Sequence, residues 1–288
     1  MNAVRRLCPW LPVVALAGLL AGCAARPAPQ APPAIEAAEA THIPRPDPAD
    51  AAFTAFRRDY ARVPSNAVAL FVGASFTFTS PKRNNRTVLE FWGNFDLPLR
   101  LDVRAGIGTS LAHFREDETG LLAFYPDRRE AYAHSDPVRG ARMLELPLLF
   151  SLKELGLAVA GSVSSLVPER YRSAGPGPDG GFVYAFEPGR VESLTLSAAG
   201  RPLALTGVLA PRGERPGGPW RLEFSDYEQD AGQALAQRIT LSLPGEEKGV
   251  LRIKTRELRL LPWPAKALDL ALPDGTIVYL LDRQAPPS

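Results

Sequence analysis

The sequence predicts a mainly β (α+β) fold, built on one long antiparallel sheet with a short helical segment in mid-chain. Apolar and polar residues alternate with a period of two through most of residues 68–135 and 182–281, as in strands with one buried face. Turns of hairpin length, rich in Gly, Pro, Asn and Asp, separate these stretches. Between the two runs, residues 137–167 change to helical spacing.

The first expected element is a short amphipathic helix at residues 49–60, because three aromatic side chains share one face: Phe53, Phe56 and Tyr60. Six strands should follow, at residues 68–79, 87–97, 99–107, 110–115, 121–125 and 130–133. The strand at 99–107 shows the cleanest alternation of apolar and charged residues, which indicates one buried face and one wetter face.

Residues 137–157 predict a helical insert. Pro147 lies inside it, so we expect either two short helices or one helix that starts near this proline. Residues 175–181 are rich in Gly and Pro and are expected to form a flexible loop. Seven further strands are expected, at residues 182–186, 191–197, 203–209, 220–226, 238–243, 249–260 and 276–281.

Residues 1–22 are typical of a secretory signal peptide. Two arginines precede an apolar run over residues 11–20, which is far shorter than the ~20 residues that a membrane-spanning helix needs. The segment Leu20-Ala21-Gly22-Cys23 resembles the lipobox of bacterial lipoproteins, which implies cleavage before Cys23 and lipidation of its thiol and amine. Ala24 replaces the Asp that favours inner-membrane retention in enterobacterial lipoproteins. The expected location is therefore the cell envelope, lipid-anchored at the periplasmic face of the outer membrane.

Residues 23–48 are rich in Pro and Ala and predict a semi-extended linker behind the lipidated cysteine. Residues 49–288 then form one expected domain. The formal net charge of the chain is +2, and it falls to zero when the two signal-peptide arginines are removed. A neutral chain lacks the basic stripe that nucleic-acid binding needs. Cys8 leaves with the signal peptide, so Cys23 has no cysteine with which to form an internal disulfide.

A long antiparallel sheet with one apolar face must cover that face. The few helices, in mid-chain, favour a curled, unclosed sheet with a helical lid or plug in its concavity. The apolar side chains on this face either line a lipid cavity or form a filled core, and the pattern leaves both open. The cavity candidates are Phe76, Phe78, Leu89, Phe91, Phe95, Leu101, Val103, Leu144, Leu148 and Leu152.

Four stretches make the chain similar to the LolA/LolB superfamily of periplasmic lipoprotein carriers, and the lipobox makes it resemble the LolB branch. They are Phe91-Trp92-Gly93-Asn94 running into residues 99–103, Gly106-Ile107-Gly108, Leu144-Glu145-Leu146-Pro147, and residues 220–227 with the strands that follow. The resemblance implies a half-barrel of about eleven strands with a helical lid, whose apolar cavity takes lipoprotein acyl chains. It also implies an exposed apolar residue after the third strand that helps to insert cargo into the membrane, and Ile107 is the positional match for this membrane-insertion residue. Residues 263–288 extend beyond the family pattern.

The partners that the resemblance implies are lipid or lipoprotein acyl chains, the membrane that holds the anchor, and a periplasmic lipoprotein carrier, with the protein itself a monomer. The alternative is a structural or assembly lipoprotein of the envelope that docks a partner protein and has a filled core. We expect no enzyme, cofactor or metal, because the three histidines, His42, His113 and His134, lack metal-site spacing and no nucleophile motif is present. Asp226, Glu228 and Asp230 alternate near a strand end, which favours a solvated acidic turn over the alternative of a weak calcium site. The basic turn at Lys82, Arg83 and Arg86 is either a solubilising hairpin tip or a contact for lipid headgroups.

Overall fold

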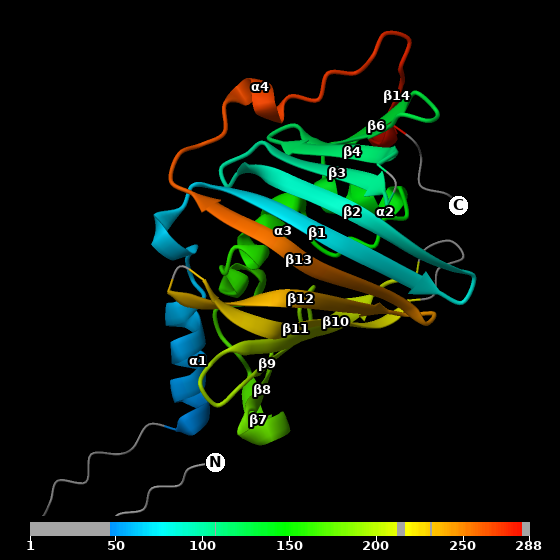
Figure 1. Cartoon of the computed structure of the whole chain (residues 1–288). Coiled ribbons are helices and arrows are strands. Elements are labelled where there is room, and N and C mark those ends of the chain that lie inside the picture. The colour runs from blue at the N-terminus through cyan, green and yellow to red at the C-terminus, as the bar shows by residue number, and fades with distance from the viewer. Residues whose placement is uncertain (1–46, 107, 212–216, 231, 284–288) are drawn as a thin grey trace, which may run out of the picture. The chain divides into compact units, whose positions relative to one another are not determined.

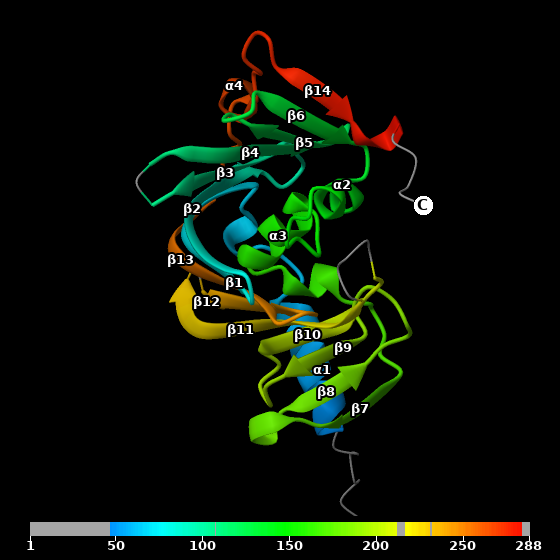
Figure 2. The same ribbon diagram turned by 90° about the vertical axis from the view of Figure 1, so that its right-hand side faces the viewer.

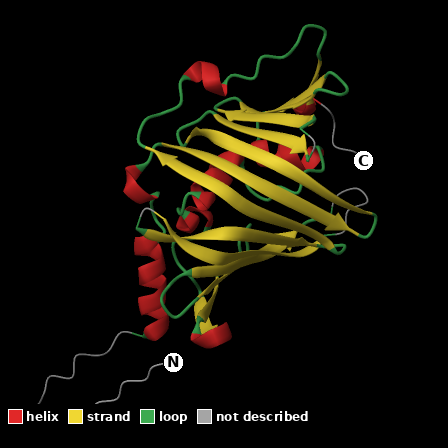
Figure 3. Ribbon diagram, viewed as in Figure 1, coloured by secondary structure: helices red, strands yellow, loops and turns green. Residues whose placement is uncertain are grey.

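A computed structural model of the chain describes residues 47–106, 108–211, 217–230 and 232–283. In this part of the chain, fourteen strands form a single curled, unclosed sheet with few helices (Figures 1 and 3). The predicted class and curled shape are therefore confirmed, with fourteen strands where the sequence pattern predicted thirteen and the resemblance implied about eleven. The signal peptide, Cys23 and nearly all of the linker lie outside the described residues, as does Ile107.

The first half of the sheet is a simple meander in which each strand pairs antiparallel with the next. Its strands are β1 (Ala69–Ser80), β2 (Arg83–Asn94), β3 (Leu99–Ala105), β4 (Ser110–Asp117), β5 (Gly120–Tyr125) and β6 (Glu130–His134). The alternation in the sequence fixes the two faces. Phe91 and Leu99 are buried on the inner face. Trp92 and Arg100, which lie next to them in the two strands and opposite each other, point to the outer face.

The second half is also an antiparallel meander. Its strands are β7 (Ser173–Pro176), β8 (Phe182–Ala185), β9 (Ser193–Leu196), β10 (Pro202–Leu209), β11 (Gly218–Asp230), β12 (Gln233–Leu243) and β13 (Glu247–Arg259). Strand β13 pairs with β1, with Phe76 opposite Leu251, and so joins the halves. A last strand, β14 (Ile277–Leu280), completes the order β14-β6-β5-β4-β3-β2-β1-β13-β12-β11-β10-β9-β8-β7.

Two features of the strands differ from the prediction. The loop expected at residues 175–181 is not a flexible connection throughout, because it begins inside β7 and then forms a turn of 3-10 helix at Pro178–Gly180. The strand was not predicted because its glycine and proline are residues typical of loops. It lies at the edge of the sheet, where the missing amide of a proline is tolerated. The strand expected at residues 276–281 is present as β14, but it pairs parallel to β6, whereas all other pairs are antiparallel.

Helix α1 (Pro48–Asp59) begins at Asp47, whose side chain accepts a hydrogen bond from the Ala49 amide, and it buries Phe53 and Phe56. The mid-chain insert contains two short helices, α2 (Pro137–Met143) and α3 (Leu152–Val159), and a 3-10 turn, η2 (Val163–Leu166). Figure 2 shows α2 and α3 inside the curve of the sheet, as expected of a lid or plug. Helix α3 starts after Ser151 rather than near Pro147, because Ser151 and Glu154 form a capping box there.

The interior has two apolar clusters. One gathers α1, η2 and the strands β8–β12 around Phe56, Tyr184 and Trp220. The other gathers β1–β5 and α3 around Leu70, Phe91 and Leu99. The insert contributes to both clusters, so it fastens the two halves of the sheet together. No helix in the described part of the chain is both long and apolar enough to cross a membrane.

After β13 the chain crosses the outer face of β2–β4 and then joins the edge of the sheet beside β6; residues 263–283 form this strap. The strap contains α4 (Ala265–Leu268), β14 and the 3-10 turn η4 (Leu281–Arg283). Outward side chains of the sheet donate hydrogen bonds to its carbonyls, as Trp92 Nε1 does to Ala267 (3.2 Å) and Arg115 Nε to Leu268 (3.1 Å). These contacts fix an extended segment through its backbone, with little requirement for apolar periodicity in its sequence.

Candidate lipid-binding surface

The inner face of the sheet and the insert meet in direct apolar contact. A Cβ atom added to Gly156 of α3 would lie 3.2 Å from the Phe91 ring and 3.5 Å from the Leu99 side chain. Glycine therefore lets the helix approach β2 and β3 more closely than a residue with a side chain would allow. In Figure 2, α3 lies in the curve of the sheet.

The structure brings eight of the ten candidate residues into the cluster around α3. Three of them are buried, namely Phe91, Phe95 and Leu152, and five are half-buried, namely Leu89, Leu101, Val103, Leu144 and Leu148. The remaining two, Phe76 and Phe78, lie side by side on β1 with ring centroids 6.5 Å apart. The half-buried residues include Leu89 of β2 and Val103 of β3, which lie opposite each other in the sheet.

A buried carboxylate holds the start of α3 to the sheet. Glu116 lies on β4 and is only 3 % exposed, and its Oε2 accepts a hydrogen bond of 2.5 Å from the Leu152 amide. Burial raises the pKa of the Glu116 carboxyl, against the lowering effect of hydrogen bonds from Leu152, Lys153 and Ser151. The free amides at a helix N-terminus favour such a negative partner.

A second polar contact holds the other side of the same helix end. Arg190, in the loop between β8 and β9, donates two hydrogen bonds to the Glu154 carboxylate, one of them of 2.9 Å. Its guanidinium carbon also lies 4.8 Å from the centre of the Phe150 ring. Strand β4 and the loop between β8 and β9, which are far apart in the chain, thereby fix the first turn of α3.

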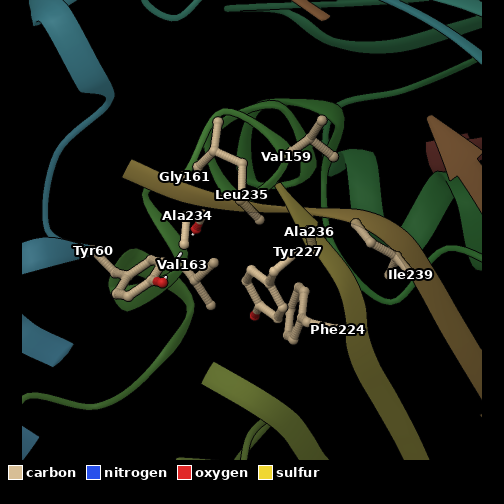
Figure 4. Close-up of a pocket in the computed structure, with 11 residues that line it drawn as sticks. Tyr60, Val159, Gly161, Val163, Phe224, Tyr227, Ala234, Leu235, Ala236 and Ile239 are labelled. Atoms are coloured by element: carbon tan, nitrogen blue, oxygen red, sulfur yellow. Dashed lines mark hydrogen bonds between the residues drawn. The ribbon is translucent and has the colours of Figure 1, made fainter. Parts of the chain in front are cut away.

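The C-terminal end of the insert contacts the turn after α1. Arg57 donates a hydrogen bond to the Ser164 carbonyl (3.1 Å), and the Ser162 hydroxyl donates one to the Ala61 carbonyl (3.0 Å). Next to this contact lies a small pocket, shown in Figure 4, between η2 and the strands β11 and β12. Tyr60 borders it and donates its hydroxyl proton to the Ala234 carbonyl at 3.2 Å, and burial raises the pKa of Tyr60 to about 12.

The volume of this pocket is about 10 Å³, room for about one water molecule. This pocket is too small for an acyl chain. The insert lies in the curve of the sheet, against its apolar inner face.

Three of the polar residues singled out in the sequence, His113, His134 and Asp226, have partners in the structure. His113 Nδ1 lies 2.8 Å from Asp102 Oδ1, and His134 Nδ1 accepts a hydrogen bond of 2.9 Å from the Asp136 amide. Asp226 pairs with Arg238 at 3.2 Å. Within the described ranges, no group of three or more His, Cys, Asp or Glu side chains is placed to hold a metal ion.

Sequence reasoning missed Glu116 as a residue of this surface. The signal was present, because Glu116 has the same inward parity on its strand as Ala112 and Phe114. A carboxylate at an inward position needs a donor, and the start of α3 supplies it. Arg190 gave no comparable signal, since its partner comes from a remote part of the chain.

Comparisons with known proteins agree on the fold. No sequence profile of a protein family matches the chain, and no curated protein matches it. A LolA superfamily protein from Nitrosomonas europaea has a similar structure, with a TM-score of 0.52 and 9% identity over 76% of this chain and 97% of that one. A DUF1329 family protein from Desulfovibrio piger has a TM-score of 0.51 and 10% identity over 77% of this chain and 100% of that one. The curled sheet with its inserted helices therefore has the same fold as this LolA superfamily protein.

Proposed function

We propose that this protein is a membrane-anchored lipoprotein that binds acyl chains of lipoproteins or lipids, as a carrier or acceptor in outer-membrane lipoprotein localisation. The proposal rests on one observation, which is the kind of segment that covers the inner face. An inserted segment, and not a second sheet, covers the apolar side chains of β1–β4. A segment joined to the sheet at its two ends can leave the face and return to it.

The energetics support exchange between the insert and an acyl chain. Burying one CH₂ group of a chain is worth about 0.8 kcal/mol, so a long acyl chain can replace the apolar contacts of the insert. The named polar contacts at the start of α3, Glu116 with Leu152 and Arg190 with Glu154, are the ones that would have to break. The half-buried side chains of Leu101 and Leu148 would then line the opened face.

The remaining parts of the proposal come from the sequence. Lipidated Cys23 would anchor the protein at the periplasmic face of the outer membrane, and the linker would let the folded domain reach cargo. A periplasmic lipoprotein carrier would be its upstream partner. We further propose that the protein acts as a monomer and without enzymatic chemistry.

The test is native mass spectrometry of the chain from residue 24 onwards, purified from the periplasm, with extraction and identification of bound lipid. We expect about one acylated molecule per chain, and its loss in Leu101→Arg and in Leu148→Arg. Val208→Arg is the control, since Val208 is 54 % exposed, and circular dichroism verifies that each variant is folded. A mass without ligand, unchanged after incubation with acylated peptides, would exclude the carrier function.

One observation favours the alternative of an assembly protein with a filled core. The described interior is packed, and the edge strand β14 exposes Ile277 (55 %), Val278 (48 %) and Leu280 (42 %). Exposed apolar side chains on an edge strand, which has one unpaired side, are suited to docking another protein. Under this alternative, Val278→Lys would weaken capture of a partner, whereas Leu101→Arg would act only through stability.

A further inference from the structure

The turn between β1 and β2 is cationic. Lys82, Arg83 and Arg86 are all exposed, and no acidic residue occurs between Ser80 and Glu90. None of the three cations makes an ion pair with another described residue. The adjacent turn between β12 and β13 adds Glu246, Glu247 and Lys248, so the two turns together carry four cations and two carboxylates.

The cationic turn adjoins the apolar inner face. The guanidinium carbon of Arg83 lies 5.8 Å from the centre of the Phe78 ring, and Phe78 stacks on Phe76. Both rings have the inward parity of β1, together with Val72 and Ala74. The tip of this hairpin therefore has an apolar side toward the concavity and cations at its end.

Other turns differ in this respect. In the turn between β5 and β6, Arg128 lies 3.8 Å from Asp127 and its guanidinium carbon is 5.6 Å from the centre of the Tyr125 ring. That turn carries both signs of charge. A tip made only to be soluble needs no preference for cations.

We propose that the β1–β2 tip docks on the anionic surface of a phospholipid membrane. Lys82, Arg83 and Arg86 would contact the lipid phosphates, with the stems of the side chains lying along the interface. The end of the inner face that holds Phe76 and Phe78 would then be turned toward the bilayer. Docking goes beyond acyl-chain binding and does not depend on it, although delivery of a bound chain would use this orientation.

The size of the effect follows from the charges. Each Lys or Arg near an anionic membrane strengthens binding by about fivefold. Three of them are therefore worth a factor on the order of 100 in the partition constant. The attraction is screened by salt over about a Debye length, so it should weaken strongly at high ionic strength.

The experiment uses the chain from residue 24 onwards with Cys23 absent, which keeps every described residue and removes the lipid anchor. Its co-sedimentation is measured with vesicles of phosphatidylcholine alone and with vesicles containing equal parts of phosphatidylcholine and phosphatidylglycerol. We expect binding to the anionic vesicles only. The variant Lys82→Gln/Arg83→Gln/Arg86→Gln should reduce it by a factor on the order of 100.

The matched control is Arg62→Gln/Arg170→Gln/Lys266→Gln, which changes the net charge equally at three exposed residues scattered over the molecule. It should keep most of the binding. Equal binding to both vesicle types, or equal losses in the two triple variants, would overturn the proposal. Native mass spectrometry of the same proteins reports acyl-chain binding separately, so a failure of the carrier function is distinguishable from a failure of docking.

Discussion

The Glu116 carboxylate accepts a hydrogen bond of 2.5 Å from the Leu152 amide and so connects strand β4 to the first residue of α3. Both groups are buried. This contact makes the position of the insert sensitive to one titrating side chain.

The first prediction concerns the pH dependence of this contact. Burial raises the pKa of Glu116 above its ordinary value of 4.5, so folding favours the protonated carboxyl. Its contribution to stability is fully present below the ordinary pKa and is lost as the pH rises through the pKa of the folded state. We expect Glu116→Gln to lose stability less steeply than the parent chain between about pH 4 and about pH 8, measured by urea unfolding. Parallel pH profiles of the two proteins would contradict this assignment, since they share every other titrating group.

A second variant of the same residue separates charge from hydrogen bonding. Glutamine retains an oxygen that can accept from Leu152, whereas Glu116→Ala leaves this buried amide without a partner. We expect the alanine variant to lower the free energy of unfolding by about 1–3 kcal/mol relative to the glutamine variant. Equal stability of the two variants would mean that the amide finds water in the folded protein.

Because α3 lies so close to the sheet, a larger side chain at Gly156 should lower the free energy of unfolding. Gly156→Val places atoms against the Phe91 ring, where a Cβ alone would lie at 3.2 Å. We expect a loss of about 1–3 kcal/mol in the free energy of unfolding. Gly175→Val is the control, because a Cβ on Gly175 meets nothing within 4 Å. If both variants lose the same stability, close packing of α3 is not the cause.

The ion pair of Arg190 with Glu154 predicts a local effect. Both side chains are partly exposed, 43% for Arg190 and 27% for Glu154, so the pair adds little to global stability. We expect Arg190→Ala to speed amide hydrogen exchange in residues 152–159 while the urea midpoint barely changes. Arg221→Ala, which removes a comparable pair with Glu223 on the sheet surface, should leave exchange in α3 unaltered.

The strap on the outer face gives a further prediction. Leu268 of α4 is fully buried, whereas Leu261, just before the strap, is 73% exposed. We expect Leu268→Ala to cost about 2–5 kcal/mol of unfolding free energy, and Leu261→Ala to change it by no more than about 0.5 kcal/mol. Thermal and urea unfolding measure both. A small effect of Leu268→Ala would mean that the strap is not part of the cooperative unit.

The strand pattern was predictable because a sheet with one buried face has alternating apolar and polar residues along its strands. Leu99, Leu101 and Val103 show this directly. The capping box at Ser151 was also within reach, since Ser and Glu are three residues apart there. In contrast, the strap is held by hydrogen bonds from Trp92 and Arg115 to its carbonyls, and backbone carbonyls have no sequence signature.

The candidate site was harder to predict than the sheet. The inward residues of β1–β3 were identified by the alternation along each strand. How fully the concavity of the sheet is filled depends on how closely α3 approaches these residues, and the absence of a side chain at Gly156 sets that distance. The contact of Arg190 with Glu154 joins segments with no common periodicity. Such contacts arise from the tertiary arrangement, so local patterns do not contain them.

The pairing of β1 with β13 has a consequence for the order in which the molecule assembles. Each half of the sheet consists of neighbouring strands that can pair as soon as they leave the ribosome or the export channel, but the seam between the halves needs residues 247–259. Folding should therefore end with a slow, long-range closure. A chain that stops before β13 would have an unpaired β1 and an unpaired β12, two open edges able to pair with other copies and aggregate.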